Sequence, residues 1–114
     1  MKTVLHVMNY GASYRGNFMD SLKSLDEKIS EFDMKNIYLF CADAKQNDAR
    51  QWIDDMQKQG DIVEFLTGEL KKDVKIIRDM IDNYQVQIVH THFTKRQQHL
   101  AMVIATRFRK VKIF

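Results

Sequence analysis

The sequence predicts one α/β domain built on a parallel sheet, and two observations support this fold class. Short apolar runs alternate with segments of helical periodicity along all 114 residues. The runs are too uniformly apolar to leave one face of a sheet in water, which is typical of parallel strands covered by helices on both faces. With 45% hydrophobic residues the chain can build one compact core. We therefore expect residues 1–114 to form a single domain.

Five apolar runs are predicted to be strands, and their lengths match those of buried strands. They span residues 3–9, 36–42, 61–66, 86–92 and 111–114.

Two helices are predicted from apolar residues that recur every three or four positions. The two sets are Phe18, Leu22, Leu25, Ile29 and Phe32, and then Leu70, Val74, Ile77, Ile81 and Tyr84. Each set makes one apolar stripe, which we assign to packing against the sheet.

Two further helices are predicted from weaker patterns. One spans residues 47–59 and stops at Gly60. The last opens with Thr94-Lys-Arg-Gln97, a capping-box pattern in which two side chains satisfy unpaired backbone N–H groups. This helix is expected to bury Leu100, Ala101, Ile104, Ala105 and Phe108.

Right-handed crossovers between these elements favour a doubly wound sheet, and we expect the Rossmann-like strand order 3-2-1-4-5 with helices on both faces. In that order the first and fourth strands are neighbours where the winding reverses. Ligands bind such sheets at the carboxyl ends of the strands. The loop 9–17, which contains Gly11 and Gly16, is then expected beside His90 and His92 at the end of the fourth strand.

The charge of the chain is unevenly distributed although the net charge is only +3. All 15 acidic residues lie between Asp20 and Asp82, whereas residues 94–114 carry six cations and no acid. The basic last helix forms either a solvated face or a contact with anionic lipid, a phosphate-bearing substrate or further protein. Nucleic acid is not expected as a partner, because aromatic residues are not interleaved with these charges.

Cysteine content and hydropathy indicate a cytoplasmic protein. The single Cys41 lies in an apolar run and cannot form an internal disulfide, which suits a reducing compartment. No apolar run approaches the roughly 20 residues needed to span a bilayer.

The glycine loop and the histidines leave several kinds of chemistry open. Gly11 and Gly16 do not fit the dinucleotide or P-loop fingerprints, but they allow close backbone approach to a ligand. His90 and His92, spaced i, i+2 on a strand, could bind a metal, support the core, or donate hydrogen bonds to a polar ligand such as a sugar. A metal is disfavoured because few further ligands lie nearby. No Ser-His-Asp arrangement or activated thiol is present, so covalent catalysis is not expected.

Three segments, taken in order, resemble a known family. They are the strand Val4-Leu-His-Val7, the loop and helix start Arg15-Gly-Asn-Phe-Met-Asp-Ser-Leu22, and the strand Gln87-Ile-Val-His-Thr-His92. Together they look like the N-terminal lobe of the family 4 retaining glycosyltransferases, which have the two-lobe GT-B architecture. The likeness spans nearly the whole chain.

The resemblance implies a larger hexosyltransferase that moves a sugar from a nucleotide-sugar to a glycan or lipid-linked acceptor. It requires no metal or resident cofactor, and the nucleotide-sugar is a co-substrate bound mainly by a C-terminal lobe. Gly16 and Asn17 would approach the donor diphosphate, His92 would hydrogen-bond the donor sugar, and His90 would support the fold. Where the family often has adjacent glycines this chain has Arg15-Gly16, and Arg15 could instead meet an acceptor phosphate.

The resemblance also implies that residues 1–114 form the acceptor-side lobe of a longer protein. The E-x7-E element of the second lobe has no counterpart here, so we assign no catalytic residue to this chain and expect the fragment alone to be inactive. Peripheral contact with the inner face of the membrane through the basic last helix is an accompanying expectation. The alternatives are a stand-alone flavodoxin-like module that binds a small ligand, and a metallohydrolase piece that uses His90 and His92.

Overall fold

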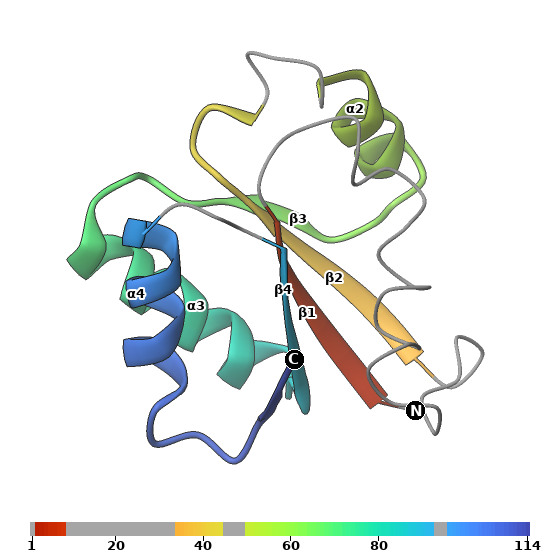
Figure 1. Ribbon diagram of the computed structural model, residues 1–114. Helices are drawn as coiled ribbons and strands as arrows, with labels where there is room; N and C mark the ends of the chain where they lie inside the picture. The colour runs from red at the N-terminus through yellow and green to blue at the C-terminus, as the bar shows by residue number, and fades with distance from the viewer. Residues whose placement is uncertain (1, 9–33, 45–49, 93–95) are drawn as a thin grey trace.

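The computed structural model describes residues 2–8, 34–44, 50–92 and 96–114, with only the backbone of His92 (Figure 1). Eight elements lie within these ranges. They are β1 (Lys2–Met8), β2 (Met34–Phe40), α2 (Arg50–Lys58), β3 (Val63–Phe65), α3 (Leu70–Asn83), β4 (Ile88–His92), α4 (Arg96–Thr106) and β5 (Lys112–Ile113). The predicted loop 9–17 and the predicted helix through Phe18 and Phe32 lie outside the described residues.

The five strands form one parallel sheet in the order β3-β2-β1-β4-β5, which confirms the predicted Rossmann-like order. The register places His6 of β1 opposite both Tyr38 of β2 and His90 of β4. Two residues later, Met8 lies opposite His92. The carboxyl ends of β1 and β4 are therefore side by side, as the sequence predicts.

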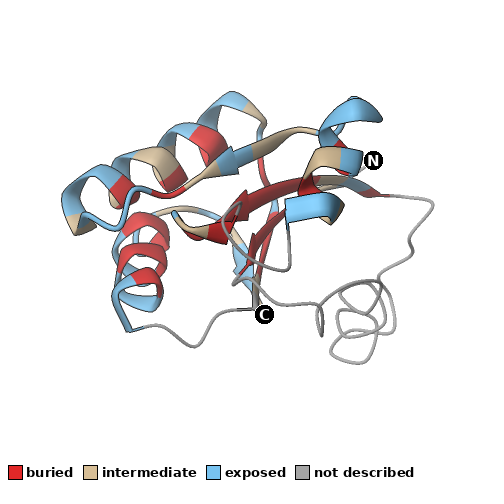
Figure 2. Cartoon of the chain, turned by 90° about the horizontal axis from the view of Figure 1, so that it is seen from above, coloured by how far each residue is buried: buried red, intermediate tan, exposed pale blue. Residues whose placement is uncertain are grey.

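Alternation along the strands divides the core between the two faces of the sheet. Leu5, Val7 and Val89 point to the face that α3 and α4 cover, whereas Met8 and Phe40 pack with α2 on the other face (Figure 1). Figure 2 shows the buried residues concentrated on the strands and on the inward sides of the helices. Helices thus cover both faces, as expected for parallel strands without a solvated side.

Helices α2 and α3 end in the same way, although only one of them uses glycine. After α2, Gly60 has a φ of 87°, and Asp61 N donates to Met56 O at 3.0 Å while Gly60 N donates to Gln57 O at 3.1 Å. This is a Schellman motif, and it confirms Gly60 as the predicted stop. After α3, Gln85 takes the left-handed position with a φ of 53°, and Val86 N donates to Ile81 O at 2.9 Å.

The orientation of α4 differs from the predicted one. The helix buries Ala101 and Ala105 as expected, but Leu100, Ile104 and Phe108 are exposed. The buried side of α4 is instead completed by Gln98, Met102 and Thr106. Because α4 is apolar on two sides, periodicity alone could not choose between them, and the side with two alanines permits the closer approach to the sheet and α3.

Candidate functional site

The carboxyl edge of the sheet is the candidate site, because parallel α/β sheets bind ligands there. β1 and β4 end next to each other at Met8 and His92, at the point where the winding of the sheet reverses. Gly11, Arg15, Gly16 and Asn17 follow β1 and lie outside the described residues, as does the side chain of His92. The structure therefore brings together the two strand ends on which the predicted site depends.

His90 lies one pleat back from this edge and is part of the core. Its side chain is 1% exposed, and its Nδ1 atom lies 3.2 Å from Nδ1 of the fully buried His6. His6 Nε2 lies 2.8 Å from the side-chain oxygen of Asn36, which can only accept, so Nε2 carries a proton. In neutral His6, Nδ1 then accepts from the Nδ1–H of His90. The Nδ1 atom of His90 is thus used inside the protein and is not available to a ligand.

Metal binding finds no support in the described ranges 2–8, 34–44, 50–92 and 96–114. Within them, no group of three or more His, Cys, Asp or Glu side chains is placed to hold a metal ion. His6 is packed between polar and aromatic neighbours, with its ring stacked on Tyr38 at a centroid distance of 5.3 Å. The two buried imidazoles and the Asn36 side chain form a polar row across β4, β1 and β2.

A cavity of about 230 Å³ lies at the same carboxyl edge. Its lining comes from the segments that follow β2 and β3 and from the first turns of α3 and α4: Ala42, Asp43, Gly68, Asp73, Gln97 and Gln98. Liquid water occupies about 30 Å³ per molecule, so this volume corresponds to roughly eight waters. The cavity is large enough for a small polar molecule, and residues that follow two different strands contribute to its lining.

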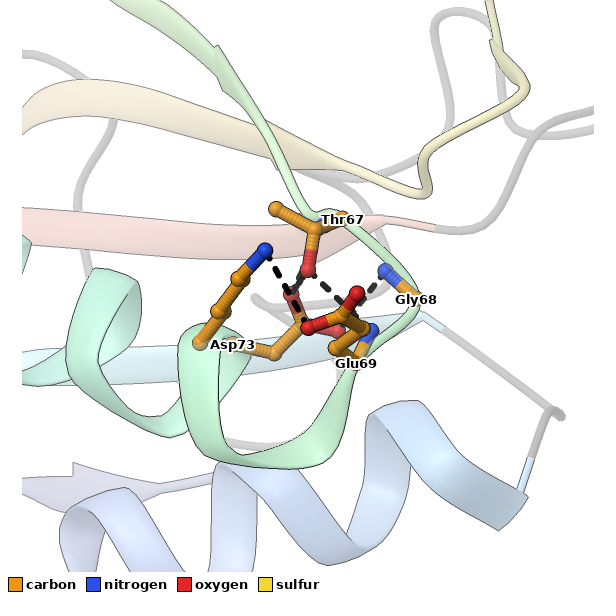
Figure 3. A network of polar contacts seen from close by, with 5 residues as sticks. Thr67, Gly68, Glu69 and Asp73 are labelled. Atoms are coloured by element: carbon orange, nitrogen blue, oxygen red, sulfur yellow. Dashed lines mark hydrogen bonds and ion pairs between the residues drawn. The ribbon is translucent and has the colours of Figure 1, made fainter.

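The Asp73 carboxylate fixes one wall of this cavity (Figure 3). Asp73 is fully buried in the first turns of α3, and its Oδ1 accepts from Thr67 N at 2.7 Å and from the Thr67 hydroxyl at 2.8 Å. Its Oδ2 accepts from Gly68 N at 3.1 Å, and the Thr67 hydroxyl accepts from Glu69 N at 3.1 Å. These bonds join the loop after β3 to the start of α3. The Asp73 side chain therefore has a structural role in the cavity wall.

The first turn of α4 also lines the cavity. Gln98 is 7% exposed and lines the cavity, and its Oε1 has no hydrogen-bond partner among the described residues. A buried acceptor without a partner costs stability unless a ligand or water supplies a donor. Asp43, which follows β2, is half-buried and belongs to the same lining. The lining is thus rich in hydrogen-bond acceptors, which favours a ligand with hydroxyl groups and disfavours an anion.

Sequence reasoning missed Asp73 and Gln98 as residues of this edge. The segment Thr67-Gly-Glu-Leu-Lys-Lys-Asp73 does carry a signal, because a threonine after a strand and an aspartate one turn into the next helix can bond across the turn. Gln98 gave no signal, since its burial depends on which side of α4 meets the sheet.

No protein-family model, curated protein or solved structure matches this chain. The fold defines the class of the protein as an α/β domain with a Rossmann-like sheet, and its functional assignment depends on the site.

Proposed function

We propose that this domain is the acceptor-side lobe of a retaining glycosyltransferase that moves a hexose from a nucleotide-sugar to a glycan or lipid-linked acceptor. The observation that carries the proposal is the pairing of β1 with β4, with Met8 opposite His92. Because of this pairing, the last residue of β1, after which the 9–17 segment begins, lies beside the end of the strand that carries His92. The resemblance in sequence implies that these two strand ends are neighbours.

The hydrogen-bond acceptors in the cavity lining support a sugar as the ligand. Sugars present several hydroxyl donors, and the Oε1 atom of Gln98, without a partner among the described residues, can accept one of them; the carboxylate of Asp43 belongs to the same lining. The carboxylates of Asp43 and Asp73 disfavour a phosphate in the same cavity. We therefore assign the cavity to the sugar-bearing acceptor, and the donor diphosphate to the loop that contains Gly16 and Asn17.

In this proposal His92 donates a hydrogen bond to the donor sugar, and Arg15 meets a phosphate of the acceptor. His90 supports the fold through its bond to His6, which keeps the β1 and β4 pleats in register beneath the site. The nucleotide and most of the charge stabilisation of its leaving diphosphate belong to a second lobe. The contribution of this chain is to bind and orient the acceptor.

The test is a transfer assay on the full gene product that contains this chain, with a panel of nucleotide-hexoses and NMR analysis of the anomer formed. We expect transfer with retained configuration, and a loss of about 10²–10³ in kcat for His92→Ala, the cost of removing one well-placed donor. The matched control is His99→Ala, an exposed histidine of α4, which should retain full activity. Equal turnover in the two variants would remove His92 from the site, and absence of transfer with every donor would refute the proposed activity.

A further inference from the structure

Five large apolar side chains of α4, the segment after it and β5 are exposed, and we call them the α4–β5 patch. Their exposed fractions are 38% for Leu100, 42% for Val103, 39% for Ile104, 80% for Phe108 and 45% for Ile113. Leu100, Val103 and Ile104 follow helical spacing, so they form one stripe on α4. Ile113 is opposite Val89 in the sheet register and thus points to the same side of the sheet as α4.

The patch is not a by-product of a loosely packed helix. The opposite side of α4 is tightly buried through Ala101 and Ala105, at 0% and 1% exposure. Two contacts join this region to α3: Arg78 donates to Ile104 O at 3.3 Å, and Arg109 pairs with Asp82 at 3.2 Å. α4 is therefore held in this orientation, and its outward stripe is a fixed feature of the surface.

Cations flank the patch in sequence, and no acid lies in the same segment. Arg96, Arg107, Lys110 and Lys112 are exposed, and residues 94–114 contain no Asp or Glu. The guanidinium of Arg107 lies 5.2 Å from the centre of the Phe108 ring. An exposed aromatic ring flanked by cations is suited to a surface with an apolar interior beneath an anionic outer layer.

We propose that the α4–β5 patch docks on the surface of a bilayer that contains anionic lipids. Apolar side chains enter the boundary between headgroups and acyl chains, while Lys and Arg remain at the level of the phosphates. The charges argue against a second copy of the chain, because two patches face to face would bring cations against cations. The contact is peripheral: within the part of the chain that the structure describes, no helix is long and apolar enough to cross a membrane.

The contact is expected to depend on both the cations and the aromatic ring. Each Lys or Arg near an anionic surface contributes about fivefold in binding, and the electrostatic part weakens as salt shortens the Debye length. Burial of the Phe108 ring contributes about tenfold or more. The electrostatic contribution is absent on phosphatidylcholine, which lacks net charge, and burial of one ring alone gives only weak binding.

The test is cosedimentation of the 114-residue chain with vesicles of phosphatidylcholine, alone or mixed with phosphatidylglycerol. We expect binding only to the mixed vesicles, falling as salt rises. Phe108→Ser and Lys110→Glu should each weaken binding about tenfold or more. Lys58→Glu is the matched control, because Lys58 is exposed on α2, across the sheet, and it should bind nearly as wild type. Urea midpoints of Phe108→Ser and Lys110→Glu should stay near wild type, since both side chains are exposed.

Three results would overturn the proposal. The first is no binding to the anionic vesicles. The second is an equal loss in Lys58→Glu and Lys110→Glu, which would show attraction by net charge without a docking face. The third is a concentration-dependent dimer in sedimentation equilibrium that Phe108→Ser abolishes, which would assign the patch to a second copy of the chain.

Discussion

The Asp73 carboxylate joins the start of α3 to the loop after β3, and replacing it by asparagine has a cost that can be worked out from its contacts. The asparagine oxygen can keep both bonds from Thr67, which join Oδ1 at 2.7 and 2.8 Å. The amide nitrogen then faces Gly68 N, which is 3.1 Å from Oδ2 in the wild type. Two donors then face each other, so the bond from Gly68 N is lost.

The magnitude follows from typical values for such bonds. A hydrogen bond to a charged group contributes about 1.5–3 kcal/mol. The penalty for an unsatisfied buried donor does not apply, because Gly68 is exposed and water can reach its N–H. We therefore expect Asp73→Asn to lower the free energy of unfolding by about 2 kcal/mol. Asp73→Ala removes all three acceptor contacts and is expected to cost about 4 kcal/mol.

The assay is urea denaturation followed by far-UV circular dichroism and by the fluorescence of Trp52, the single tryptophan. The midpoint should fall while the slope m stays constant, because the surface exposed on unfolding does not change. Asp79→Asn is the control: Asp79 is exposed on the same helix and pairs with Lys75, and such pairs contribute about 0–1 kcal/mol. If Asp73→Asn were as stable as wild type within about 0.5 kcal/mol, the carboxylate would not hold this loop and the reasoning would be refuted.

Two further predictions concern the core and a helix end. His6→Ala and His90→Ala should show a coupling energy of about 1–2 kcal/mol in a double-mutant cycle measured by urea denaturation, because each substitution removes the partner of the other. Additive effects of the two substitutions would contradict the Nδ1–H···Nδ1 bond. Gln85→Gly should raise the free energy of unfolding by about 0.5–1 kcal/mol, because Gln85 holds a φ of 53° that glycine adopts without strain; a lower thermal midpoint would contradict this.

The strand order could be predicted because it depends on features that are local in sequence. Uniformly apolar runs separated by helical stripes leave few arrangements, and handedness selects among them. The stripe through Ile77 and Ile81 is one-sided, and α3 packs as predicted. α4 is apolar on two sides, and its orientation was decided by how closely Ala101 and Ala105 let it approach its neighbours. That information is absent from periodicity.

The candidate site could be predicted only in part. The i, i+2 spacing of His90 and His92 places both residues on one face of a strand, but it does not say how deeply each lies. The depth of His90 depends on its register with His6, a residue 84 positions away in sequence. Likewise, the role of Asp73 depends on the turn that Thr67 and Gly68 form before α3. Contacts of this kind are set by tertiary structure and are not visible in single motifs.

Chemical-shift mapping of the ¹⁵N-labelled chain during titration with neutral hexoses and N-acetylhexosamines tests most directly whether the carboxyl edge binds sugar. Saturable shifts are predicted for the backbone amides of Gly68, Gln97 and Gln98, with little change at Lys2 and Gln87 near the amino ends of β1 and β4. Shifts concentrated at Lys2 and Gln87, or no saturable shift with any sugar, would contradict the assignment of this edge to a sugar-bearing acceptor.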